Sequence, residues 1–284
     1  MRARWDDGGA HGLRVVIDLG MQELMCDAER RSLVTQLQLS YADPLRLAVD
    51  AVEKAMALPE PSRRSCSSRD DGAATPASQR ERASAKADDA LGRFDRSPAT
   101  RLLFSSLSGV FESFLANDRG STRWAVRRSA RRFDEAAAEL LGARRETGAV
   151  AGEFERDSIV VLSPDADATF ALNEPLDTTG TIYVVGGLCD YRRVEGATLR
   201  RARAAARRER IRVVAKRLPI AEAFEANASV NILTVNQTVE ILSRVARNAG
   251  DWRAAFIETL PERKLRELRA RGSFAASDDA ALDG

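Results

Sequence analysis

Histidine, cysteine and long hydrophobic runs are scarce in this 284-residue sequence, and each scarcity argues against a class of function. The only histidine is His11, so we expect neither a histidine-centred catalytic triad nor a histidine metal site. Cys26, Cys66 and Cys189 form no CxxC pair, which argues against a zinc site or a disulfide framework and favours a reduced, intracellular location. No apolar stretch is long enough to span a bilayer, so no membrane partner is expected.

Charged residues are abundant but nearly balanced: they make up 30% of the chain and leave a formal net charge of +2. Basic residues gather at 119–132 and 200–217, while acidic residues are prominent at 165–174 and from 278 onward. Such asymmetry can mark a surface that binds a polyanion, although two solvated helix faces would give the same pattern. Composition alone leaves both interpretations open.

Short β-branched runs alternate with helix-like segments, which predicts an α/β fold with a parallel sheet. We expect strands at 13–18, 101–107, 158–163, 181–185 and 211–215, and helices over 21–41, 45–58, 123–141, 196–210 and 238–247. Residues 59–97 contain few large apolar side chains, so we expect a disordered insertion within one domain.

The stretch from Thr181 to Asp190 organises the rest of the chain. It begins as a buried strand and ends on Gly186 and Gly187, which permit positive φ or the close approach of another segment. Asp190 follows at the carboxyl end of the strand, where open α/β sheets bind ligands. Glycine and aspartate are also ordinary turn residues, so this pattern alone leaves Asp190 open between a turn and a site.

Several segments, taken in order, resemble the SPOUT superfamily and, within it, the tRNA purine-9 N1-methyltransferases. These segments are 16–18 with the helix at 29–41, then 160–165, 183–190, 216–220, 232–237 and 250–256. The resemblance implies a SPOUT methyltransferase domain over residues 10–260, with helices flanking a parallel sheet and a deep trefoil knot at its carboxyl end. The insertion at 59–97 would interrupt this domain, and residues 261–284 would form a polar tail.

The resemblance also implies S-adenosylmethionine-dependent methyl transfer to N1 of the purine at position 9 of tRNA, with guanine the expected base. Asp190 matches the acidic residue proposed as catalytic in this family. Guanine N1 carries a proton at neutral pH, so a carboxylate could remove it as a general base, whereas adenine N1 needs no base. The implied cofactor-binding residues are Leu162, Ser163, Gly186, Gly187, Leu188, Asp190, Tyr191, Arg192, Arg193, Val194, Thr198, Leu218, Leu233, Thr234 and Val235.

A folded tRNA must be held by its phosphates, and the resemblance gives the basic clusters this role. The implied RNA-binding residues are Arg123, Arg127, Arg128, Arg131, Arg132, Arg192, Arg193, Asn236 and Gln237. Asn236 and Gln237 could instead hold the knot loop, and both roles stay open at this point. The family implies a monomer. The sequence itself leads us to expect no metal, and it leaves the location open between cytoplasm and nucleus.

Two other functions compete with this one. A non-catalytic tRNA-binding subunit could keep the fold and assist another tRNA-processing enzyme, and failure to bind S-adenosylmethionine would favour it. An unrelated nucleotide-binding protein is disfavoured, because no GxGxxG follows a strand and no GxxxxGK[ST] occurs. Cys189 and Tyr191 flank Asp190 where the family pattern leads us to expect other residues.

Overall fold

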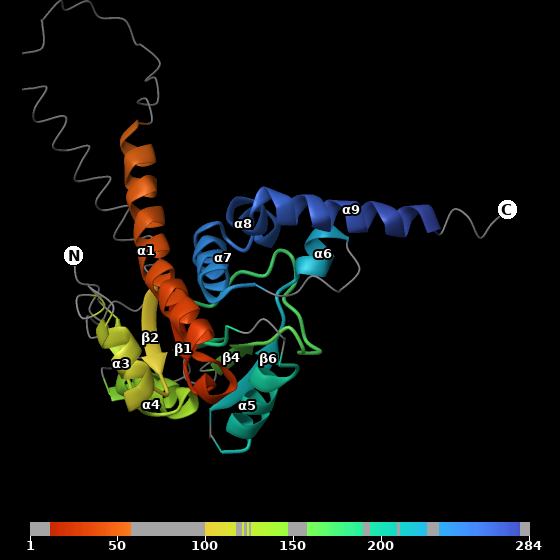
Figure 1. Ribbon diagram of the computed structural model, residues 1–284. Coiled ribbons are helices and arrows are strands. Elements are labelled where there is room, and N and C mark those ends of the chain that lie inside the picture. The colour runs from red at the N-terminus through yellow and green to blue at the C-terminus, as the bar shows by residue number, and fades with distance from the viewer. Residues whose placement is uncertain are drawn as a thin grey trace, which may run out of the picture. The chain divides into compact units, whose positions relative to one another are not determined.

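A computed structural model describes residues 12–57, 100–117, 121, 124, 126–146, 158–189, 194–208, 211–225 and 233–278 (Figure 1). The chain divides into two compact units, one of residues 1–44 with 98–284 and one of residues 45–97. The first unit contains the sheet and the helices that cover it. The insertion expected at 59–97 lies outside the described residues.

The first unit is built on a six-stranded sheet in the order β3-β2-β1-β5-β4-β6, and every pairing between neighbouring strands is parallel. This confirms the α/β class and the parallel sheet expected from the sequence. The strands are β1 (Arg14–Asp18), β2 (Arg101–Ser105), β3 (Arg127–Arg128), β4 (Ser158–Leu162), β5 (Thr181–Gly186) and β6 (Arg212–Lys216).

Helices cover both faces of this sheet. In chain order they are the short 3-10 helix η1 (Gln22–Leu24), α1 (Asp27–Ala57), α3 (Gly109–Asn117), α4 (Phe133–Glu146), α5 (Ala197–Ala206), α6 (Ile220–Phe224), α7 (Val235–Arg247), α8 (Trp252–Thr259) and α9 (Glu262–Asp278). Of these, α4 and α5 pack against one face, and α1, α3, α7 and α8 belong to the core of the other face (Figure 1).

Alternation along the strands explains the two cores, because successive side chains of a strand point to opposite faces. Val15 and Ile17 of β1 belong to the larger core, together with residues of α1, α7 and α8. Val16, between them, belongs to the smaller core with Phe133 of α4 and Ala202 of α5. The continuous apolar runs of β1, β4 and β5 are therefore buried on both sides, as parallel strands in α/β proteins are.

The prediction of a helix over 123–141 is wrong for the first half of that range. Arg127 and Arg128 form the edge strand β3 beside β2, and α4 begins only at Phe133. The backbone N–H of Ser129 donates to the carbonyl of Phe104 at 2.8 Å, which continues this pairing. A backbone pairing across more than twenty residues leaves no trace in helical periodicity, so the sequence pattern could not reveal the strand.

The last helix, α9, starts inside the stretch that we assigned to a polar tail. Leu265 and Leu268 are three positions apart and so lie on one face of this helix. Both are buried in the larger core, in which residues of α6 and α8 also take part. These two leucines add apolar packing to an otherwise strongly charged segment.

No helix of the described residues combines the length and the apolar character that crossing a membrane requires.

Candidate functional site

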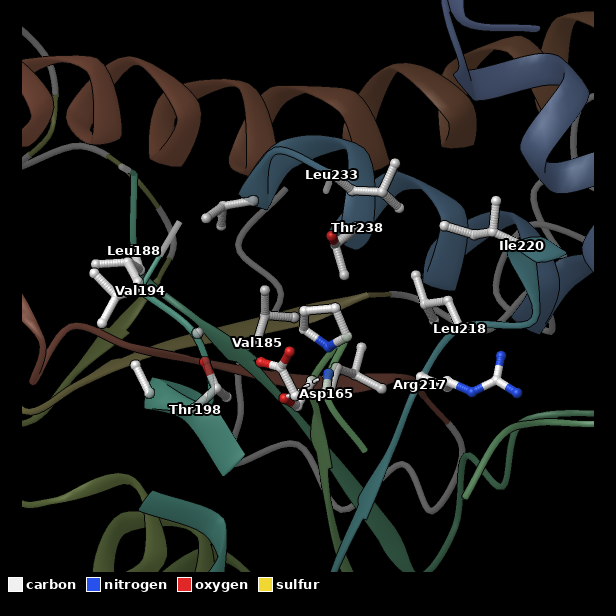
Figure 2. A pocket seen from close by; sticks show the side chains of 16 residues that line it. Asp165, Val185, Leu188, Val194, Thr198, Arg217, Leu218, Ile220, Leu233 and Thr238 are labelled. Atoms are coloured by element: carbon white, nitrogen blue, oxygen red, sulfur yellow. Dashed lines mark hydrogen bonds between the residues drawn. The ribbon is translucent and has the colours of Figure 1, made fainter. Parts of the chain in front are cut away.

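A cavity of about 150 Å³ opens at the carboxyl end of the sheet, where β4, β5 and β6 finish (Figure 2). Its walls come from the segments that follow these three strands, from the start of α5 and from the start of α7. The strand order places β5, β4 and β6 side by side, so their carboxyl ends bring distant parts of the chain together. This is the edge at which open α/β sheets bind ligands.

Nine residues predicted from the resemblance for cofactor binding line this one cavity. They are Leu162, Ser163, Gly186, Leu188, Val194, Thr198, Leu218, Leu233 and Val235. Gly187 and Thr234 do not line it, although each is next in sequence to a residue that does. Asp190, Tyr191, Arg192 and Arg193 lie outside the described residues, so the catalytic role of Asp190 stays a prediction.

The sequence reasoning missed seven further residues of the lining, namely Pro164, Asp165, Val185, Ala197, Arg217, Ile220 and Thr238. Asp165 and Arg217 follow the ends of β4 and β6, and that position was a usable signal. The guanidinium of Arg217 is directed away from the other lining side chains (Figure 2). It forms an ion pair with Glu222 in the first turn of α6 at 2.7 Å.

Asp165 ties the segment after β4 to the start of α5. Its Oδ2 accepts a hydrogen bond from the backbone N–H of Gly196 at 2.8 Å. Gly196 is the N-cap of α5, has no side chain and adopts a positive φ of 66°. The first N–H groups of a helix lack partners within the helix and carry partial positive charge, so a carboxylate is well suited there. Asp165 thereby helps to fix Thr198, the second residue of α5, at the cavity wall.

Gly186 and Gly187 are required for close approach and not for positive φ, since neither is among the positive-φ residues of the described chain. A Cβ at Gly187 would lie 2.6 Å from Cδ2 of Leu19 and 2.9 Å from the carbonyl oxygen of Asp18. That same oxygen accepts the Gly187 N–H at 2.9 Å, so the end of β5 rests directly on the end of β1. At Gly186 a Cβ would lie 2.7 Å from Oγ1 of Thr198.

The start of α7 answers one question that the sequence left open. Thr234 is its N-cap, and the Thr234 hydroxyl accepts the backbone N–H of Gln237 while the Gln237 side chain accepts the N–H of Thr234. Gln237 therefore has a structural role in a capping box, and the spacing Thr-x-x-Gln was a readable signal for it. Asn236, its neighbour, is half-buried.

Of the arginines predicted to bind RNA, the four that the structure describes are not part of the cavity lining. Arg127 and Arg128 lie on β3, at the opposite edge of the sheet from β6, and Arg131 and Arg132 lie between β3 and α4. Arg123 lies outside the described residues. Two of these arginines share one carboxylate of α4: Arg127 and Arg131 both pair with Glu139, at 3.2 and 3.4 Å.

Arg132 forms an ion pair with a buried carboxylate. It pairs with Asp134 at 3.1 Å, and Arg208 of the segment after α5 reaches the same carboxylate at 2.9 Å. The Asp134 side chain is 0% exposed, and burial alone would raise its pKa. The hydrogen bonds from Arg208 and Arg132 outweigh burial and hold the pKa of Asp134 below its usual value.

Among the residues that the structure describes, no group of three or more histidine, cysteine, aspartate or glutamate side chains is arranged to hold a metal ion.

A parallel sheet with a cavity between the carboxyl ends of its strands is the arrangement in which α/β proteins typically bind small ligands. Residues 93–265 match the model of the family described as tRNA (guanine(9)-N(1))-methyltransferase TRM10/TRM10A. The chain belongs to this family, as the resemblance of its sequence motifs indicated.

Individual relatives agree with the family. The chain is 34% identical over 122 residues to the tRNA (guanine(9)-N1)-methyltransferase of Eremothecium gossypii, covering 43% of this chain and 37% of that protein. It is 33% identical over 127 residues to that of Schizosaccharomyces pombe, covering 45% of this chain and 38% of the relative. The chain thus spans well under half the length of these curated relatives.

Two solved structures share the fold. Full-length spTrm10 in complex with SAH superposes with a TM-score of 0.53 at 21% identity and covers 88% of this chain and 96% of its own. The structure of spTrm10(74) superposes with a TM-score of 0.54 at 20% identity and covers 88% and 95%.

Proposed function

We propose that this protein transfers a methyl group from S-adenosylmethionine to N1 of guanine at position 9 of tRNA. Membership of the TRM10/TRM10A family carries the proposal. The relatives in Eremothecium gossypii and Schizosaccharomyces pombe are tRNA (guanine(9)-N1)-methyltransferases by name, and the related spTrm10 structure is a complex with SAH. SAH is what remains of S-adenosylmethionine once the methyl group has been transferred.

The chemistry of the cavity fits S-adenosylmethionine. Aliphatic side chains such as Leu162, Val185 and Leu218 can pack against the faces of an adenine ring. Hydroxyl and carboxylate oxygens, including those of Thr198 and Asp165, suit ribose hydroxyls and an ammonium group. Bound there, S-adenosylmethionine would supply an electrophilic methyl group on its sulfonium. The chain's own task is then to hold the acceptor base and to remove its proton.

We assign the proton removal to Asp190. It follows Leu188 and Cys189 in the sequence, and Leu188 lines the cavity. A carboxylate at hydrogen-bond distance from guanine N1 would accept the N1 proton as the new N–C bond forms. The base is enclosed in the tRNA core, so it would have to be flipped out of its stack to reach the cavity.

The trefoil knot implied by the resemblance is part of the same proposal. Support comes from the convergence of Leu218, Leu233 and Val235 with Leu162 and Leu188 at one cavity, as a knot that encloses the cofactor would require. A single copy of the chain supplies all of these residues, which supports a monomeric enzyme. For tRNA phosphates we retain Arg127 and Arg128 on β3 and Arg131 just after it, with Arg192 and Arg193 as neighbours of Asp190 in the sequence.

Methyl transfer onto two unmodified tRNA transcripts that differ only in G or A at position 9 tests the proposal. An N1-methyl purine blocks Watson–Crick pairing, so reverse transcription should stop at position 9 of the G transcript. Asp190→Asn should reduce this stop sharply, because the N1 proton then has no general base. Full activity of Asp190→Asn would contradict the base assignment while leaving the reaction intact.

The alternative is a non-catalytic subunit that holds tRNA for another enzyme. A protein that binds tRNA but gives no stop and no calorimetric signal with S-adenosylmethionine would establish that alternative in place of the enzyme. The cavity and its polar lining favour the enzyme, because a subunit without catalysis has no need of a small-ligand site.

A further inference from the structure

Gln36 connects two cavity segments that lie far apart in the sequence. It is a half-buried residue of α1, next to the buried Leu37 on the side of the helix that faces the larger core. Its Oε1 accepts the backbone N–H of Val235 at 2.9 Å, and its Nε2 donates to Sγ of Cys189 at 3.2 Å. The two partners are 46 residues apart (235 − 189), and one amide group contacts both.

The orientation of this amide follows from chemistry. A backbone N–H can only donate, so the oxygen of Gln36 must face Val235 and the NH₂ group must face Cys189. Val235 is the first residue of α7, and its N–H has no partner inside the helix. The N-cap hydroxyl of Thr234 is engaged with Gln237. Gln36 therefore supplies the partner that the first N–H of α7 would otherwise lack.

The other end of the connection, at Cys189, makes two further contacts. The backbone N–H of Cys189 donates to Sδ of Met25 at 3.3 Å, and its thiol donates to Oγ of Ser32 at 3.4 Å. Met25, Ser32 and Gln36 thus bring the start of α1 against the residue that directly precedes Asp190 in the sequence. Cys189 is also the position at which the family pattern led us to expect a different residue, and its sulfur is the acceptor of the Gln36 amide.

We propose that Gln36 is a positioning residue for the cofactor cavity, acting by holding the segment after β5 and the start of α7 at a fixed separation. Leu188 lies beside Cys189 in the sequence, and both Leu188 and Val235 line the cavity. Gln36 itself is not part of the lining, so it acts through these neighbours. The inference rests on the proposed function, because S-adenosylmethionine is the ligand whose binding it predicts.

Four variants test the connection. Gln36→Met keeps the length of the side chain and removes both hydrogen bonds. Gln36→Glu keeps the acceptor for Val235 and removes the donor toward Cys189. Adding Cys189→Ser to Gln36→Glu reverses the polarity of the contact, because a serine hydroxyl can donate to the carboxylate more strongly than a thiol can. Gln38→Met is the matched control, since Gln38 is an exposed glutamine of the same helix.

Calorimetry with S-adenosylmethionine measures the effect on the cavity. Gln36→Met should bind about tenfold more weakly than the wild type, as expected when two neutral hydrogen bonds that shape a site are lost. Gln36→Glu should be intermediate, and the reversed pair with Cys189→Ser should recover most of the affinity. In methyl-transfer assays, Gln36→Met should raise KM for S-adenosylmethionine and leave KM for tRNA unchanged, which general destabilisation would not do.

Hydrogen exchange of the Val235 amide provides a readout that needs no ligand. In the free protein, Gln36→Met should accelerate exchange of this amide about fivefold or more, whereas Gln36→Glu and Gln38→Met should not. Equal S-adenosylmethionine affinity in wild type and Gln36→Met would overturn the inference, whether or not exchange of the Val235 amide changes. An equal loss of affinity in Gln38→Met would also overturn it, because the effect would then belong to α1 as a whole.

The two proposals fail in different ways. If the wild type binds no S-adenosylmethionine, the proposed function falls, and exchange at Val235 alone decides whether Gln36 holds the start of α7. If the wild type binds it and Gln36→Met does so equally well, the function stands and the positioning role falls.

Discussion

Replacing Gly187 by alanine tests the idea that the end of β5 rests on the end of β1. The added Cβ would lie 2.9 Å from the carbonyl oxygen of Asp18 and 2.6 Å from Cδ2 of Leu19. The leucine methyl can rotate, but the carbonyl is backbone of a central strand and accepts the Gly187 N–H. We expect overpacking of this kind to lower the free energy of unfolding by about 1 to 3 kcal/mol.

Gly142→Ala is the matched control. Gly142 lies inside α4, and a Cβ there meets nothing within 4 Å. Both substitutions lower the conformational entropy of the unfolded chain by a similar amount. The difference between their free energies of unfolding therefore reports on the native surroundings of the two glycines. Gly142→Ala should raise the free energy of unfolding by roughly 0.5 to 1 kcal/mol, because alanine is the better helix former.

Urea unfolding followed by circular dichroism measures both effects by linear extrapolation. The two midpoints should move in opposite directions from that of the wild type, with little change in slope. A Gly187→Ala protein as stable as the wild type would refute the close approach of β5 to β1. Movement of both midpoints in the same direction would refute the argument that a Cβ is crowded at Gly187 and unhindered at Gly142.

Three further changes have defined outcomes. Arg201→Met should lower the free energy of unfolding by about 2 to 3 kcal/mol, because it leaves the 3% exposed carboxylate of Asp18 without its ion pair. The loss stays below that of a fully buried pair, since Arg201 is 29% exposed. Burial raises the pKa of Asp177, but hydrogen bonds from nearby threonine and glycine groups outweigh it and leave the pKa lowered. Asp177 therefore stabilises the fold above its unfolded pKa and loses this effect as pH falls through the folded value, so Asp177→Asn should unfold with a flatter pH dependence below about pH 4. Glu139→Gln should strengthen tRNA binding severalfold in low salt and have no effect in high salt, as measured by filter binding.

Those parts of the fold that depend on the local hydrophobic pattern could be predicted from the sequence. Buried strands appear as continuous β-branched runs, as in Val15 and Ile17 of β1, and this predicts a parallel sheet directly. Gly186 and Gly187 were expected to allow either positive φ or close approach, and the second proved to be the reason. Nine residues of the cavity lining were expected from the family motifs and seven were not. Local pattern could not place any of them together, because the segments that meet at the cavity are separated along the chain.

The parts that escaped prediction depend on single long-range contacts of polar groups. Asp165 meets the N–H of Gly196 31 residues away, and Gln36 meets Val235 199 residues away. A hydrogen bond of this kind needs one donor and one acceptor at one place in space, so it imposes no periodicity on the residues around it. The edge strand at Arg127 could not be predicted either, because its pairing with β2 is made by backbone groups, which are alike in every residue.

The basic residues beside β3 show why a count of arginines is a poor measure of a nucleic-acid surface. Glu139 is 45% exposed, and exposed pairs such as those it forms with Arg127 and Arg131 contribute only about 0 to 1 kcal/mol each. A phosphate could replace Glu139 at little cost, so both arginines remain available to the phosphates of the proposed tRNA substrate. Arg132 differs, because its partner Asp134 is fully buried and would lose one of its two arginine partners if Arg132 turned outward. The cluster that looks uniform in the sequence therefore divides into arginines that can exchange partners and one that stabilises the fold.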